Sequence, residues 1–177
     1  MDSGGAGPMK ITRRNVLLLL LVSCLIVWPA LLALEYSYRE PDNFALIEEN
    51  LYMGGSVLAP PPGTRAVLNL CPARDRYQCE VYVHDPIPDA APGPTMAWLR
   101  EKVEFIDAQR CAERTTYVHC MNGASRSGLV VAAYLMHKHG WTRDEAVAFI
   151  RERRPQMRPN PAFMKLLSEW ERMLCAS

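Results

Sequence analysis

The sequence predicts an α/β domain in which a central mixed or parallel sheet is flanked by helices, preceded by one N-terminal transmembrane helix. Three observations lead to this fold class. Short β-type runs alternate with a helical segment in the middle of the chain, the second half has a helical pattern, and a long uncharged apolar run lies near the N-terminus. Strands interleaved with helices are typical of a sheet covered by helices, and 177 residues leave room for one ordinary domain.

The first 42 residues are predicted to lie outside that domain. Residues 15–34 are apolar and uncharged over a length that can cross a bilayer as a helix. A short basic tail at 1–14 precedes this predicted anchor, and a polar linker at 35–42 follows it. The folded domain is expected to cover 43–177.

The charges on either side of the apolar run predict its orientation. Lys10, Arg13 and Arg14 precede the run, and only Arg39 lies close behind it. Positive residues are enriched on the cytosolic side of membrane helices. We therefore expect a single-pass membrane protein with a cytosolic N-terminus and the domain on the far side of the membrane.

Two other interpretations of the apolar run stay open. A cleaved signal peptide would be cut after Ala30 or Ala33, which would place Trp28 or Leu31 where a small residue is preferred. The segment that ends at Cys24 also resembles a bacterial lipoprotein box, although the apolar stretch before it is short and continues beyond it. An uncleaved anchor fits the sequence best.

The middle of the chain predicts strands with a helix between them. Short runs rich in Val, Leu or Tyr and bounded by turn residues predict strands at 65–70, 80–84 and 115–119. Between the second and third runs, apolar residues recur at helical spacing over 95–109, and Thr95 can cap the helix.

The last third of the domain predicts three helices. The first covers 129–139 and ends at Gly140, a residue suited to the left-handed C-cap conformation. The second begins with a capping box formed by Thr142 and Glu145. The third follows Asn160, with a proline at its first position.

Composition argues against several classes of function. The chain has 20 basic and 19 acidic residues, which does not suggest a general nucleic-acid binder. Its six cysteines lack paired C-x-x-C spacing, so neither a disulfide scaffold nor a zinc site is expected. His84, His137 and His139 are more typical of surface or packing positions than of metal ligands. We expect no metal and no cofactor. A set of arginines is interpreted as charged helix surface: Arg143, Arg151, Arg153, Arg154 and Arg158.

The segment at residues 119–128 carries the chemistry. Cys120 follows a predicted strand, and Arg126 lies six positions later at the mouth of a helix. Backbone N–H groups of the loop between them can converge on an anion, and the helix dipole adds to their field. The side chain of Arg126 can bind two phosphate oxygens at once. The same field should lower the pKa of Cys120 and make it a nucleophilic thiolate. The expected phosphate-binding positions are Met121, Asn122, Gly123, Ala124, Ser125 and Arg126.

This Cys-x5-Arg-Ser signature resembles the protein tyrosine phosphatase superfamily, and its surroundings resemble the dual-specificity branch. Further likenesses lie at residues 50–54, 67–70, 133–136, 154–155 and 159–160. Together they extend over about 43–174. The resemblance implies a dual-specificity phosphatase-like fold and a hydrolase that cleaves phosphate monoesters through a phosphocysteine intermediate.

The resemblance also implies roles for individual residues. An upstream aspartate protonates the leaving oxygen in that family, and the spacing to Asp107 favours Asp89 over Asp85, which is the fallback. Ser127 resembles the hydroxyl that eases departure of the thiolate. His119 is expected to orient the loop and tune Cys120 rather than transfer protons.

Cys71 is a possible redox partner of Cys120. Residues 69–71 resemble a segment of the phosphatase-and-tensin lipid phosphatases that carries a resolving cysteine. Such a cysteine would trap an oxidised nucleophile as a disulfide. A small buried side chain at a strand end is the alternative interpretation.

The expected function is therefore a membrane-anchored phosphatase for phosphotyrosine, and also for phosphoserine and phosphothreonine, in proteins. Met121, Asn122, Ala124 and Ser125 are uncharged, whereas phosphoinositide-directed relatives typically have lysines in this loop. The expected partners are a phosphorylated protein, or a phospholipid, and the membrane. A lipid-phosphate phosphatase is one alternative. The other is a phosphate-binding pseudophosphatase, which the intact Cys120 disfavours.

Overall fold

The computed structural model describes residues 23–29 and 43–176. Within the first range, η1 (Ser23–Val27) is a short π-helix. No helix in these two ranges is both long and apolar enough to cross a bilayer. The rest of the predicted anchor at 15–34 lies outside the described residues, together with the basic tail and the linker, so the transmembrane helix stays a prediction.

The domain is built on a five-stranded mixed sheet with the strand order β1-β2-β5-β3-β4. Its strands are β1 (Phe44–Glu48), β2 (Leu51–Gly54), β3 (Thr64–Asn69), β4 (Val81–His84) and β5 (Thr115–His119). β1 runs antiparallel to β2, and the other pairs are parallel. The three predicted strands are confirmed to within one residue at each end. β1 and β2 are strands that the sequence did not predict as such.

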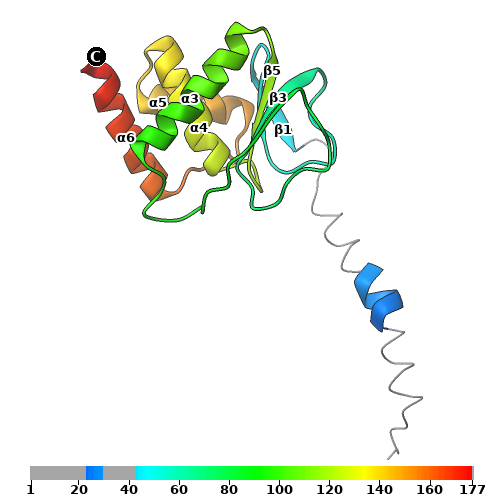
Figure 1. Ribbon diagram of the computed structural model, residues 1–177. Coiled ribbons are helices and arrows are strands. Elements are labelled where there is room, and N and C mark those ends of the chain that lie inside the picture. Colours follow the sequence, from blue (N-terminus) through cyan, green and yellow to red (C-terminus); the bar gives the residue numbers. More distant parts are fainter. Residues whose placement is uncertain (1–22, 30–42, 177) are drawn as a thin grey trace, which may run out of the picture. The chain divides into compact units, whose positions relative to one another are not determined.

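Helices α3 to α6 gather on one face of the sheet (Figure 1). They are α3 (Met96–Cys111), α4 (Arg126–His139), α5 (Arg143–Arg153) and α6 (Pro161–Cys175). The predicted end signals are confirmed. The side chains of Thr95 and Asn160 accept hydrogen bonds from the first turns of α3 and α6. Thr142 and Glu145 form the capping box of α5, and Gly140 ends α4 at a φ of 67°.

Helix α4 is the central helix of the domain. It contacts the sheet and each of α3, α5 and α6, and its residues from Arg126 to Met136 are buried. A helix that is buried all round is expected to be apolar all round, and the apolar pattern indeed begins at Leu129. The helix itself begins three residues earlier than predicted, because the first turn contains polar residues that face the loop before it.

The main core lies between the sheet and these helices. Its largest fully buried side chains include Trp170, Phe163 and Tyr134. Trp170 also donates its indole N–H to the carbonyl oxygen of Ala133 at 3.0 Å, which joins α6 to α4. Since β2, β3 and β5 are parallel, their carboxyl ends meet at one edge of the sheet, which is where α4 begins. Residues that follow these strands are thus brought together.

Candidate active site

The loop at residues 120–125 connects the end of β5 to the start of α4. The backbone N–H of Cys120 donates to the carbonyl oxygen of Gly54 at 3.2 Å, and that of Ser56 donates to Met121 at 3.0 Å, so the loop is tied to the end of β2. Gly123 has a φ of 66°, which glycine adopts readily. A Cβ at Gly123 would also collide with the backbone of Gly54. This loop can therefore close only with glycine at its tightest point.

Cys120 lies at the centre of this loop. Its side chain is buried, and its Sγ lies 3.4 Å from Ser127 Oγ. Burial by itself raises the pKa of the thiol. Hydrogen bonds from the hydroxyl and the backbone N–H of Ser127, the charge of Arg126 and the backbone N–H of Gly123 outweigh this effect, so the pKa of Cys120 is lower than usual. The site thus favours a thiolate, the form of cysteine that attacks phosphorus.

The guanidinium of Arg126 is held by two backbone carbonyl oxygens and lies near one carboxylate. Its Nη1 donates to the carbonyl oxygens of Leu70 at 3.1 Å and Ile87 at 3.5 Å, which follow β3 and β4. Its buried Nε forms no hydrogen bond among the described residues, and lies 3.8 Å from Asp89 Oδ2. The guanidinium is therefore held near Cys120, between the backbone acceptors and the carboxylate of Asp89.

The structure brings Asp89 to the rim of the loop. Its Oδ1 accepts hydrogen bonds from Ser125 Oγ at 2.6 Å and from Asn160 Nδ2 at 2.8 Å. The carboxylate is also partly exposed, at 37%. Asp89 therefore lies beside the loop, in hydrogen-bond contact with its last residue, Ser125.

Asp85, the fallback, is engaged elsewhere. Its Oδ2 lies 2.5 Å from Lys102 Nζ and accepts a hydrogen bond from Trp98 Nε1 at 2.8 Å. Both partners belong to α3. This carboxylate therefore fastens the end of β4 to α3, and the structure brings Asp89 rather than Asp85 to the loop.

His119 lies in a buried network behind Cys120. Its Nε2 is 2.8 Å from Asp75 Oδ2, and its ring stacks on Tyr117 with the ring centres 4.9 Å apart. Burial raises the pKa of Asp75, but hydrogen bonding to His119, the histidine's charge and the Tyr82 hydroxyl have the larger effect and lower it. The network fixes the histidine ring, and the expected role of His119 in orienting the loop stays a prediction. Asp75 was missed, since it lies in a charged loop without a motif.

Cys71 lies at the end of β3, beside the end of β5. It is buried, and its Sγ lies 3.7 Å from His119 Nδ1. Its backbone N–H donates to Asn69 Oδ1 at 2.7 Å, which shapes the turn after the strand. The cysteine therefore has a packed position next to the active-site histidine, and its role as a redox partner stays a prediction.

Arg154 corrects the interpretation of the arginines as charged helix surface. Arg143 is half-buried, and Arg151, Arg153 and Arg158 are exposed. Arg154 is only 2% exposed and hydrogen-bonds to the carbonyl oxygens of Asn122 and Gly123. Assigning Arg154 to a solvated face was therefore wrong, because the tight turn after α5 directs its side chain under the loop.

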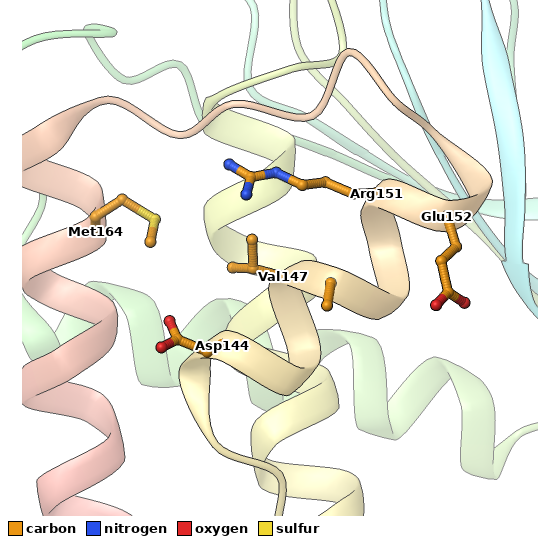
Figure 2. Close-up of a pocket in the computed structure, with 6 residues that line it drawn as sticks. Asp144, Val147, Arg151, Glu152 and Met164 are labelled. Carbon is orange, nitrogen blue, oxygen red and sulfur yellow. The ribbon is translucent and has the colours of Figure 1, made fainter.

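A separate surface hollow of about 510 Å³ lies between α5 and α6. Figure 2 shows Arg151, Asp144 and Met164 around it. Its lining shares no residue with the loop at 120–125 and contains no cysteine, serine, threonine, histidine or lysine. The candidate nucleophile therefore lies at the loop and not in this hollow. Among the residues that the structure describes, no group of three or more His, Cys, Asp or Glu could hold a metal ion.

Comparison with known proteins agrees with this geometry. The family model "Dual specificity phosphatase, catalytic domain" matches residues 64–173. Human dual specificity protein phosphatase 8 is 37% identical over 107 residues, which are 60% of this chain and 17% of that protein. Human protein phosphatase Slingshot homolog 2 is 33% identical over 117 residues, 65% of this chain and 8% of that protein. The chain thus spans less than a fifth of the length of either relative.

Solved structures share the fold. The structure of PTPMT1 in complex with PI(5)P matches with a TM-score of 0.68 and 25% identity, covering 76% of this chain and 98% of that one. The structure of human DUSP28 matches with a TM-score of 0.70 and 24% identity, covering 77% of this chain and 98% of that one. The fold of residues 43–176 is therefore that of a single phosphatase-type domain.

The hydroxyl of Ser127 should set the titration of Cys120. Ser127→Ala removes the strongest donor to the thiolate, so the pKa of Cys120 should rise. The pH at which iodoacetamide modifies Cys120 at half its maximal rate should move upward accordingly. Mass spectrometry of the Cys120 peptide separates this reaction from the other cysteines.

Ser168→Ala is the matched control, because Ser168 Oγ bonds within α6 to the carbonyl oxygen of Met164. It should leave the Cys120 titration unchanged. A Ser127→Ala titration that coincides with the wild type would contradict this account of the thiolate.

Proposed function

The chain belongs to the family of dual-specificity phosphatase catalytic domains, and from this membership and the loop geometry we propose that it hydrolyses phosphate monoesters by attack of Cys120 on phosphorus. One observation carries the proposal. A buried thiol with a lowered pKa lies where loop N–H groups, the α4 N-terminus and Arg126 can hold a phosphate in front of it.

In the first proposed step, the phosphate of the substrate occupies the loop and the Cys120 thiolate attacks phosphorus. The S–P bond forms as the bond from phosphorus to the leaving oxygen breaks. Asp89, in its protonated form, donates its proton to that oxygen. Ser125 and Asn160 support this assignment, since their hydrogen bonds hold the Asp89 carboxyl at the rim of the loop.

In the second step, water hydrolyses the phosphocysteine. Asp89, now ionised, takes a proton from the water as its oxygen attacks phosphorus. The S–P bond breaks and the electron pair returns to Cys120 as the thiolate. Ser127 Oγ, 3.4 Å from Cys120 Sγ, is placed to stabilise that departing charge. Inorganic phosphate leaves, and the enzyme returns to its starting state.

Replacing each of the two candidate aspartates by asparagine, one at a time, tests which of them is the general acid. Asp89→Asn should lower kcat by about 10²–10⁴-fold and remove the limb of the pH profile that reports the acid. Asp85→Asn should keep that limb and instead lower the free energy of unfolding, because the buried Lys102 loses one of its two carboxylate partners and keeps only Glu101. Loss of the same limb in Asp85→Asn and not in Asp89→Asn would reverse the assignment. Cys120→Ser should abolish turnover.

The proposed substrates are proteins that carry phosphotyrosine, and also phosphoserine or phosphothreonine. Arg126 is the charged side chain of the loop, and the positions between it and Cys120 are uncharged. The loop is therefore suited to a single phosphate group. Additional phosphates on an inositol ring would find no charged partner within it.

A lipid-phosphate phosphatase is the second candidate, and two observations favour it. The PTPMT1 structure that resembles this domain is a complex with PI(5)P. The predicted anchor at 15–34 would also hold the domain beside lipid substrates. Neither observation concerns the loop itself, so protein substrates remain the proposal.

A panel of substrates distinguishes these candidates. The full-length chain is offered phosphotyrosyl, phosphoseryl and phosphothreonyl peptides, vesicles containing a phosphoinositide monophosphate, and an aryl phosphate, each with Cys120→Ser as the blank. We expect kcat/KM for the phosphotyrosyl peptide to exceed that for the vesicles at least about tenfold, which is about 1.4 kcal/mol of transition-state stabilisation. Activity confined to vesicles would favour the lipid enzyme. A wild-type chain that is inactive on the whole panel under reducing conditions would favour a pseudophosphatase.

We also propose that residues 15–34 anchor the enzyme in a membrane with the N-terminus in the cytosol. The uncharged length of the segment and the basic residues before it support this. Protease protection of the membrane-bound chain tests it. Digestion of the domain by a protease added from the cytosolic side would contradict the proposed orientation, and release by alkaline carbonate would contradict the anchor.

A further inference from the structure

Arg154 is a buried charge directly beneath the phosphate loop. It follows α5, and its side chain reaches the loop over a sequence separation of 31 residues. The guanidinium donates from Nε to the carbonyl oxygen of Gly123 at 2.6 Å, and from Nη2 to that of Asn122 at 3.0 Å. A buried charge is costly unless it is well hydrogen-bonded. A buried arginine at this position therefore needs an explanation other than packing of the core.

The bonds of Arg154 bear on the direction of the loop N–H groups. In a planar trans peptide unit, the C=O and the N–H point in opposite directions. Because the carbonyls of Asn122 and Gly123 point at the guanidinium, the N–H groups of Gly123 and Ala124 point away from it, toward the inside of the loop. The Gly123 N–H is indeed one of the donors that lower the pKa of Cys120.

The guanidinium is itself held in place by Asn43. Asn43 Oδ1 accepts a hydrogen bond from Arg154 Nη2 at 2.6 Å, while the backbone carbonyl of Asn43 accepts one from the N–H of Gly55 at 2.8 Å. Nη2 is therefore shared between Asn43 and the carbonyl oxygen of Asn122, and Nε serves Gly123. Three acceptors shared between Nε and Nη2 suit the rigid fork of an arginine, which the single ammonium of a lysine does not reproduce.

We propose that Arg154 is a positioning residue of the active site. It sets the orientation of the two peptide units that join Asn122, Gly123 and Ala124, and thereby both the charge state of Cys120 and the grip of the loop on phosphate. The second part rests on the proposed function. The first part concerns the thiol alone and can be measured without any substrate.

Arg154→Lys in the full-length chain tests this role, since it keeps the charge and removes the fork. The half-maximal pH for alkylation of Cys120 by iodoacetamide should move upward by about one unit. If the chain is a phosphatase, kcat/KM for an aryl phosphate should fall roughly tenfold to a hundredfold, because small misplacements of a reacting geometry have effects of that size. A residue that only stabilised the fold would leave the titration of the folded protein unchanged.

Arg151→Lys is the matched control. Arg151 also donates its Nε to a backbone carbonyl oxygen, that of Met157 at 3.1 Å, but it is exposed and away from the loop. The half-maximal pH for alkylation of Cys120 in Arg151→Lys should equal that of the wild type. Asn43→Ala is the second test variant, because it retains Arg154 and removes one of its acceptors. It should move the half-maximal pH for alkylation of Cys120 upward by a smaller amount. It replaces Arg154→Lys as the test if that variant fails to fold.

A wild-type midpoint in folded Arg154→Lys, or in Asn43→Ala where the first variant does not fold, would overturn the proposal. So would an equal shift in Arg151→Lys. An upward shift in Arg154→Lys in a chain whose wild type hydrolyses no phosphate monoester would support the positioning role and reject the proposed function. The two ideas can therefore fail separately.

Discussion

A thiolate buried at the start of a helix must be surrounded by hydrogen-bond donors, because an unpaired buried charge is too costly to keep. In this chain that requirement falls on Cys120. Ser127 and Gly123 donate hydrogen bonds to it and Arg126 adds its positive charge; Gly123 lies on the turn that joins β5 to α4, and Arg126 and Ser127 lie in the first turn of α4. The strand order places this turn between the ends of β2 and β3. Hydrogen bonds from neighbouring segments hold it in place. Much of the domain can be understood as support for one loop.

That support depends on close backbone approach. A Cβ on Gly54 would collide with the carbonyl of Asn43, and one on Gly55 would collide with the side chain of Asn43 and the carbonyl of Met121. These glycines let β2 pass directly under the loop, where the Gly54 carbonyl accepts a hydrogen bond from the backbone N–H of Cys120 and lies 3.3 Å from Ser127 Oγ. Close packing and the hydrogen bonds to the loop therefore both require glycine at this strand end.

Features encoded locally could be predicted from the sequence. Capping residues such as Thr142 and Asn160 mark helix ends within a turn of where they act, and the loop residues are contiguous. Strands β1 and β2 are five and four residues long with little alternation, so pattern alone did not reveal them. The structure also places Asp89, the aspartate favoured by the spacing, beside the loop, while its role as the acid stays a prediction.

Contacts between distant segments could not be predicted. Asp75 meets His119 across 44 residues, and Arg154 meets Gly123 across 31. In the sequence both look like ordinary charged surface residues, because nothing nearby shows that the fold buries them. Their burial follows from strand order and from the turn after α5, which appear only when the chain is folded. The membrane segment is a prediction of a different kind, resting on composition alone.

The central claim is that Cys120 itself carries the phosphoryl group during turnover. Mixing the full-length chain with an aryl phosphate, quenching with acid within the first turnover, and locating the modification by peptide mass spectrometry tests this directly. The account predicts one phosphoryl group on Cys120, absent from Cys120→Ser. Steady hydrolysis without an adduct, or with the phosphoryl group on another side chain such as His119, would contradict it.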